Sequence, residues 1–152
     1  LQAQRPEGLE TEVQVWGRMA LAYSSRCFTA RHHRLRKDNC EFRCEQYPDG
    51  LALQTREHSD FLTINGIQTQ SANCLDLSPQ IPTLKNLQVD ILRLQAQSKH
   101  MEQVVHAFDT ARRREQAAVI DAQFLPPQAE RCNGYWNGSS GMQWQTIPIQ
   151  AI

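Results

Sequence analysis

The sequence lacks the features that define several large classes of protein. No apolar run approaches the roughly 20 residues that a membrane-spanning helix needs, so we expect no transmembrane segment. Basic and acidic residues both number 16, and this zero net charge provides no field that would attract nucleic acid. No charged stub followed by an apolar stretch opens the chain, so no secretory signal is visible. With 40% hydrophobic and 21% charged residues, the composition is that of a globular domain.

Cysteine is also sparse, because the 152 residues contain only five, an odd number. A small disulfide scaffold would be richer in cysteine and would favour an even count. We therefore expect a protein of a reducing compartment, the cytoplasm. The chain begins with Leu rather than Met, and we expect it to be the C-terminal part of a longer protein.

Motifs of the common enzyme classes are missing as well. The sequence contains no G-x-S-x-G, no H-E-x-x-H, no P-loop and no G-x-G-x-x-G pattern. No set of serine, histidine and acid stands out as a hydrolytic triad. The sequence therefore leaves the catalytic residues unknown.

The hydrophobic pattern predicts strands and helices in alternation. Strands are expected at residues 12–16, 51–55, 61–65 and 89–94. Helices are expected at residues 27–33, 71–77, 81–87 and 99–114. Ser24 and Ser98 are the predicted caps of the first and last helix, and "YPDG" at 47–50 predicts a turn.

Two of these elements carry the strongest patterns. The run at 89–94 is rich in apolar and β-branched residues, as in strands buried in a parallel sheet. Apolar residues recur at helical spacing in the last helix, and this stripe should face the sheet. The stripe consists of Met101, Val104, Val105, Phe108 and Ala111.

Alternating strands and helices predict an α/β fold with parallel pairing. A complete (β/α)₈ barrel typically needs about 250 residues, so this chain can supply roughly half of one. We therefore expect a partial TIM-barrel-like domain over residues 1–114, equivalent to the C-terminal half of a barrel. Residues 115–152 are rich in Pro, Gly and Asn, and we expect an irregular tail docked on the barrel.

Three of the five cysteines lie close together in residues 24–44, "SSRCFTARHHRLRKDNCEFRC". Cys27, Cys40 and Cys44 have the spacing C-x12-C-x3-C, and the short gap lets two thiolates reach one metal across a turn. The neighbouring arginines and histidines would offset the negative charge of several thiolates. Free cysteines more often pack as small hydrophobes, but this polar segment is a poor place for that. Spacing alone does not separate zinc from iron–sulfur.

Three thiolates leave a tetrahedral site one ligand short. Within the chain, the candidates for the fourth ligand are Cys74, Cys132, His32 and His33. The other possibility is a cysteine outside this chain. We expect Cys74 to pack on an apolar helix face and Cys132 to lie in the irregular tail.

Several short segments resemble a known family. They are "LAYSSRCFTARHH", "NCEFRC", "LTINGIQTQSA", "VDILRLQ" and "CNGYW". From about residue 12 to residue 136, the chain resembles the collagenase-like peptidase family, which includes the YhbU-, YegQ- and RlhA-type proteins. "NGIQT" and "CNGYW" resemble the branch of that family that serves ubiquinone biosynthesis without dioxygen.

The resemblance implies properties that the composition does not show. It implies a TIM-barrel-like fold, a 4Fe–4S cluster held by four cysteines, and a heterodimer with a homologous subunit that acts on a ubiquinone-pathway intermediate. By position, Cys27, Cys40 and Cys44 correspond to three cluster ligands, and the fourth comes from an N-terminal half that this chain lacks. The chain departs from the family in the shorter gap after Cys27 and in Gln95-Ala96-Gln97, where Ser-Pro-Gln is expected.

Three functional hypotheses remain after the sequence analysis. The chain is an iron–sulfur component of a hydroxylase complex, a collagenase-like peptidase, or a zinc-stabilised structural module. A peptidase needs a nucleophile with a base, or a metal with an open position. Since no such motif is present, the sequence favours the first hypothesis.

Overall fold

The computed structural model describes residues 2–146, apart from the side chain of Lys37. One six-stranded sheet organises these residues, with the order β2-β3-β4-β1-β5 and with β6 paired to β4 outside this path. The strands are β1 (Glu12–Tyr23), β2 (Leu51–Gln54), β3 (Asp60–Asn65), β4 (Gln68–Asp76), β5 (Ile91–Leu94) and β6 (Arg131–Cys132). The α/β class is therefore confirmed, but the sheet of the described residues is open and does not form a barrel.

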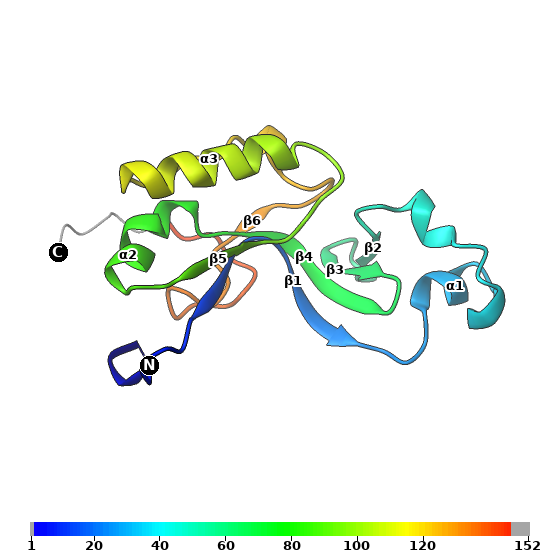
Figure 1. Ribbon diagram of the computed structural model, residues 1–152. Helices are drawn as coiled ribbons and strands as arrows, with labels where there is room; N and C mark the ends of the chain where they lie inside the picture. The colour runs from blue at the N-terminus through cyan, green and yellow to red at the C-terminus, as the bar shows by residue number, and fades with distance from the viewer. Residues whose placement is uncertain (1, 147–152) are drawn as a thin grey trace.

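The helices are short, with one exception. The α-helices are α1 (Phe28–His32), α2 (Ile81–Asn86) and α3 (Met101–Arg114). The 3₁₀ helices are η1 (Gln2–Gln4), η2 (Lys37–Asn39), η3 (Arg43–Gln46), η4 (Ser78–Gln80) and η5 (Ala122–Phe124). Figure 1 shows α2 and α3 beside β5 and β6 at one end of the molecule, and α1 beside β2 and β3 at the other. The long strands β1 and β4 connect the two ends.

Strand β1 is the spine of the sheet. It pairs in parallel with β5, from Glu12 opposite Ile91 to Trp16 opposite Leu94, and antiparallel with β4. The expected strand at 12–16 is confirmed and continues through Gly17 to Tyr23. Gly17 has a φ of +99°, and a Cβ atom there would lie 2.5 Å from Cβ of Gln95. Only glycine allows the loop after β5 to approach this closely.

The hydrophobic core lies between the sheet and the helices α2 and α3. Trp16 is fully buried, and its ring meets the ring of Phe108 edge-on with centroids 6.1 Å apart. Nε1 of Trp16 donates a hydrogen bond to Oε1 of Gln97 at 2.9 Å, so the indole nitrogen is satisfied. Leu84 of α2 and Val104 of α3 complete the centre of this core. The helices expected at 81–87 and 99–114 are thus confirmed, and Val104 and Phe108 of the second helix pack in the core as predicted.

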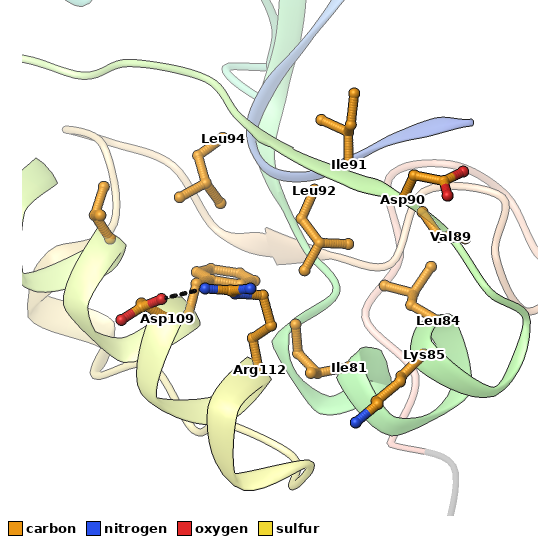
Figure 2. Close-up of a pocket in the computed structure, with 12 residues that line it drawn as sticks. Ile81, Leu84, Lys85, Val89, Asp90, Ile91, Leu92, Leu94, Asp109 and Arg112 are labelled. Carbon is orange, nitrogen blue, oxygen red and sulfur yellow. Dashed lines mark hydrogen bonds and ion pairs between the residues drawn. The ribbon is translucent and has the colours of Figure 1, made fainter. Parts of the chain in front are cut away.

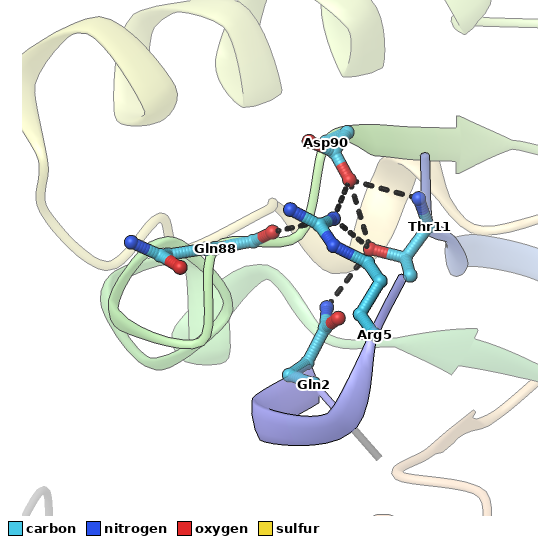
Figure 3. A network of polar contacts seen from close by, with 5 residues as sticks. All are labelled: Gln2, Arg5, Thr11, Gln88 and Asp90. Atoms are coloured by element: carbon cyan, nitrogen blue, oxygen red, sulfur yellow. Dashed lines mark hydrogen bonds and ion pairs between the residues drawn. The ribbon is translucent and has the colours of Figure 1, made fainter. Parts of the chain in front are cut away.

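The N-terminal segment is fastened to the start of β5 by a polar network (Figure 3). One carboxylate oxygen of Asp90 accepts hydrogen bonds from the backbone N–H of Thr11 at 2.8 Å and from its hydroxyl at 3.0 Å. Arg5 forms an ion pair with the same oxygen, and Gln2 donates to the Thr11 hydroxyl. The backbone N–H bond of Thr11, followed by the contacts of Arg5, holds the pKa of Asp90 below its usual range.

One predicted helix was wrong, because residues 71–77 lie mainly in strand β4. This strand has hydrogen-bonded neighbours along its length, with β3 and β6 on one side and β1 on the other. Every residue from Gln70 to Ser78 is buried. A short apolar run has no period that separates strand from helix. Pairing with the adjacent hairpin strand β3 and with the distant strands β1 and β6 therefore decided its conformation.

Both predicted helix caps were also wrong. Helix α1 begins after Cys27, whose Sγ accepts the backbone N–H of Ala30 at 3.4 Å. The hydroxyl of Ser24 accepts instead from the N–H of Arg26. Ser98 does not cap α3, because its backbone N–H and its hydroxyl both donate to the carboxylate of Asp49. Helix α1 begins at Phe28, too late for Ser24 to cap it. Ser98 instead bonds to Asp49, which is 49 residues away in the sequence.

Three further expectations need correction. Strand β5 pairs in parallel as predicted, but it lies at the edge of the sheet, so Ile91 is 41% exposed rather than buried. Val105 was expected in the core stripe of α3, yet it is 46% exposed. Cys132 was expected in irregular chain, but it lies in β6 and is fully buried. The rest of the described C-terminal region is mostly irregular, and residues 147–152 lie outside the described part.

Candidate functional site

The cysteine segment, residues 24–44, lies at the end of the molecule opposite α2 and α3 (Figure 1). Cys27 is the N-cap of α1, Cys40 is the C-cap of η2, and Cys44 lies within η3. All three thiols are free and half-buried. They are therefore accessible, in contrast with the two core cysteines.

Backbone reversals make this segment compact. Arg34, Glu41 and Phe42 have φ values of 58°, 54° and 49°, in the left-handed region that residues other than glycine seldom adopt. These three positions turn the chain between α1, η2 and η3, and α1 contacts η3 as a result. Such local strain persists only where the surrounding contacts hold it. The segment thus folds back on itself through short helical turns, with one cysteine at or in each of α1, η2 and η3.

The donor chemistry of this segment fits a thiolate-ligated iron–sulfur cluster. Three free thiols are available there, and thiolates are the usual ligands of such clusters. Nε2 of His33 is buried, and no hydrogen-bond partner for it exists among the described residues. Its ring lies against Tyr47, just after η3, with ring centroids 5.7 Å apart. The segment therefore offers an unsatisfied polar atom as well as the thiols.

The same segment does not form a finished metal site. Within residues 2–146, no group of three or more His, Cys, Asp or Glu side chains is arranged to hold a metal ion. Cys27, Cys40 and Cys44 therefore share one segment of the sequence, but in the described structure they do not converge as a metal-binding group, either with one another or with Cys74, Cys132, His32 or His33. Glu41 and Arg43 form an ion pair at 2.6 Å, so one of the arginines expected to offset thiolate charge already has a partner.

Cys74 and Cys132 have a different environment. They lie on the neighbouring strands β4 and β6, and both are fully buried in the core. Burial raises the pKa of the Cys74 thiol to about 12, and it also raises the pKa of Cys132. Both are therefore inert thiols at neutral pH. The expected packing role of Cys74 holds, although on a strand rather than on a helix.

An apolar groove between β5, α2 and α3 was not predicted from the sequence. The groove has a volume of about 540 Å³, within the range of small-molecule sites. Figure 2 shows Leu92 and Leu94 of β5 facing the helices, with the ion pair of Asp109 and Arg112 at the rim. Val105 also lines the groove. An apolar residue at this position of α3 was the one sequence signal of the groove. Helical spacing alone could not show that the Val105 side chain is left exposed.

The sequence matches one protein family over most of its length. The profile described as Peptidase family U32 matches residues 2–131. The chain belongs to peptidase family U32. This confirms the collagenase-like family that the short motifs indicated. The U32 match includes the cysteine segment and Cys74, and it ends one residue before Cys132.

A comparison of this U32 chain with the solved structures found no match. Among the helices of residues 2–146, none has the length and apolar character required to cross a membrane.

Proposed function

We propose that this U32 chain is part of an iron–sulfur subunit of the UbiV type. In this proposal, the subunit acts with a homologous UbiU-like partner in the oxygen-independent hydroxylation of a ubiquinone-pathway intermediate. The supporting observation is the division of the five cysteines into two groups. Cys27, Cys40 and Cys44 are free and accessible in one segment, while the other two are buried in the core.

The proposed ligands are Cys27, Cys40 and Cys44, with a fourth thiolate from outside this chain. When bound, a 4Fe–4S cluster supplies electron-transfer chemistry. The chain's own contribution is to position the thiolates. The backbone N–H of Ala30 already donates to Sγ of Cys27, and hydrogen bonds to cluster sulfurs tune the reduction potential. The free state of all five thiols supports the cytoplasm as the compartment.

Single Cys→Ser variants of the full-length protein test this proposal. Each variant is reconstituted anaerobically with iron and sulfide, and bound iron and the broad absorbance at about 400 nm are measured. Variants at Cys27, Cys40 and Cys44 should lose most of the iron. Variants at Cys74 and Cys132 serve as matched controls and should keep it, provided that circular dichroism shows them folded.

Three outcomes would contradict parts of the proposal. Loss of the cluster in folded Cys132→Ser protein would place the fourth ligand inside this chain. Zinc in place of iron, in protein purified under strict anaerobiosis, would remove the redox role and favour a structural metal module. Retention of iron in all three variants of the cysteine segment would exclude the proposed ligand set.

Peptidase activity is the alternative that the family name favours. A peptidase role predicts cleavage of a collagen-like peptide that survives replacement of Cys27, Cys40 and Cys44 together. The cluster proposal predicts no such cleavage. The same preparations therefore separate the two functions.

A further inference from the structure

The cysteine segment, residues 24–44, carries a concentrated positive charge although the whole chain is neutral. The segment contains six of the 16 basic residues of the chain but only two of its 16 acidic residues. The other parts of the chain therefore hold 14 acidic residues and ten basic ones. This separation gives one end of the molecule a positive field that the net charge conceals.

Four arginines of this segment are exposed, and no ion-pair partner for them exists among the described residues. They are Arg26, Arg31, Arg34 and Arg36. Glu41 is not available to them, because its carboxylate already pairs with Arg43 at 2.6 Å. Asp38 is the other acidic residue of the segment, so guanidinium groups outnumber carboxylates there. Free guanidinium groups are well suited to bind the carboxylates of another molecule, because each can form two parallel hydrogen bonds.

Large apolar side chains are also exposed in the cysteine segment and next to it. Phe42 is 71% exposed, and its backbone is in the left-handed region, with a φ of 49°. Tyr23 at the end of β1 is also 71% exposed, and Ile67 is 45% exposed. The N–H of Ser24 donates to the oxygen of Ile67 at 2.9 Å, so the end of β1 lies beside Ile67. Arginine together with exposed aromatic residues is the composition of protein interfaces, in which lysine is depleted.

Helix α1 holds this surface in a fixed position on the sheet (Figure 1). The N–H of Phe28 donates to the oxygen of Gly66 at 2.9 Å, and the N–H of Gly66 donates to the hydroxyl of Thr29 at 3.2 Å. Thr29 is only 2% exposed, so its hydroxyl is shielded from water. A surface that is fixed before binding loses little conformational entropy when a partner arrives.

We propose that the cysteine segment is the docking surface for an acidic redox protein, which its exposed arginines attract and the side chain of Phe42 anchors. This inference rests on the proposed function, because an iron–sulfur subunit exchanges electrons with a carrier. Complementary charges steer the encounter of two proteins and fix their relative orientation. Redox complexes use small interfaces, which one segment with its neighbours can supply.

The distribution of charge favours an acidic protein over a nucleic acid. The negative charge of a nucleic acid continues along its whole backbone. Beyond the cysteine segment, the acidic excess of the chain would repel such a backbone. An acidic protein can confine its charge to a patch that matches the four arginines.

The test measures binding of the full-length protein to a plant-type ferredoxin, a small acidic iron–sulfur carrier, by biolayer interferometry. The protein is used both as apoprotein and after reconstitution with iron and sulfide. Binding should weaken as sodium chloride is added, because salt screens exposed charges. Cytochrome c, a small basic carrier, is the control of opposite charge and should not bind.

Two variants with a matched control locate the docking surface. Arg31→Glu should weaken ferredoxin binding about tenfold, because it places a like charge opposite the acidic partner. Arg114→Glu should leave binding unchanged, since Arg114 is also an exposed arginine in the last turn of a helix but belongs to α3. Phe42→Ala should weaken binding without changing its salt dependence, because the variant removes an apolar contact and no charge. If Arg31→Glu does not fold by circular dichroism, Arg36→Glu, which lies outside α1, makes the same test.

Each result decides for or against the docking surface. Salt-sensitive ferredoxin binding that weakens in Arg31→Glu but not in Arg114→Glu supports it. Equal binding of cytochrome c, or equal weakening in both arginine variants, would overturn it. Tighter binding of a short polyuridine RNA, lost in Arg31→Glu, would identify a nucleic-acid surface and would also overturn it.

The docking surface and the cluster can fail separately. Protein that holds iron but binds no ferredoxin would overturn the docking surface and leave the cluster proposal standing. Arginine-dependent ferredoxin binding by protein that takes up no iron would support the docking surface, while the cluster proposal would fail.

Discussion

The five cysteines show how far the surroundings of a residue decide its chemistry. Cys74 and Cys132 are fully buried between strands, whereas Cys27, Cys40 and Cys44 are half-buried in a segment of short turns. The thiolate is the reactive form, and both desolvation and lack of access suppress it. The two groups should therefore differ in reactivity as well as in ligand capacity.

Alkylation of the native apoprotein checks this division. Iodoacetamide at mildly alkaline pH should modify Cys27, Cys40 and Cys44 first. Cys74 and Cys132 should react only after denaturation, because burial raises their pKa values, to about 12 for Cys74. Peptide mass spectrometry assigns the modified sites. In protein reconstituted with iron and sulfide, the first three should become protected, and rapid native labelling of Cys74 would contradict the packed core.

Phe108 and Val105 on α3 provide a second comparison between residues. Phe108 is 3% exposed and meets Trp16, while Val105 is 46% exposed. Phe108→Ala should lower the free energy of unfolding by about 3–5 kcal/mol, since it leaves a cavity in the core. Val105→Ala is the matched control and should change it little. Urea unfolding measures both, and the absorbance of a reconstituted cluster should be unchanged in folded Phe108→Ala protein.

At the scale of elements, the polar network at Asp90 joins two segments that are far apart in the sequence, the N-terminal residues and the start of β5. Asp90 precedes β5, Thr11 precedes β1, and Arg5 follows η1. Among the described strands, the edge strand β5 pairs with β1 alone, so its position depends on such side-chain contacts at its start. We infer that Asp90 is the main link between the N-terminal segment and the sheet.

Asp90→Asn should loosen this link, because the variant loses the charge that Arg5 and the Thr11 N–H stabilise. Hydrogen exchange at Thr11 and proteolysis of residues 2–11 should both become faster, while Glu7→Gln in the same segment serves as the control. The pKa of Asp90 lies below its usual range, so the folded state holds the charged form more strongly than the unfolded state. The contribution of Asp90 to the stability of the folded state is therefore present above the ordinary carboxyl pKa. It is lost as the pH falls through the lowered pKa of Asp90. An unchanged exchange rate at Thr11 in Asp90→Asn would contradict the link.

At the scale of the whole molecule, the sheet of the described residues has edge strands at β2 and β5, besides the two-residue strand β6 beside β4. The edge at β5 continues into the apolar groove between α2 and α3. Exposed strand edges and apolar surfaces favour association with another chain or another domain. Such association agrees with the proposed heterodimer, and it also applies to copies of this chain alone.

The isolated chain should therefore associate in a concentration-dependent manner in size-exclusion chromatography with light scattering. Ile91→Lys and Val105→Lys place charges on the exposed edge and in the groove, and both should shift the chain toward monomer. Val119→Lys is the control, since Val119 is 90% exposed and lies outside the groove lining. A compact, cooperatively melting monomer at all concentrations would show that these surfaces need no partner, and the half-barrel interpretation would then be wrong.

Patterns within a few residues were enough to predict several elements. Local geometry was enough for helix α3, for the strand predicted at 89–94 and observed at 91–94, and for the turn at 47–50. In the turn, Gly50 has a φ of +85°, and its N–H donates to the oxygen of Tyr47 at 2.8 Å. Helical periodicity and glycine in a turn act over three to four residues, so they can be read directly. The spacing of Cys27, Cys40 and Cys44 likewise depends only on the chain itself.

Contacts between distant segments decided the rest. Residues 71–76 became a strand because the distant strands β1 and β6 pair with them, and Cys132 was buried by the pairing of β6 with β4. The apolar groove combines residues within 81–94 with residues within 105–112, so no pattern inside one element could have indicated it. The sequence by itself determined the α/β class and the close spacing of Cys27, Cys40 and Cys44, because periodicity and residue spacing are local. Only the tertiary structure decided which polar and apolar groups are buried, since burial depends on partners brought together from far along the chain.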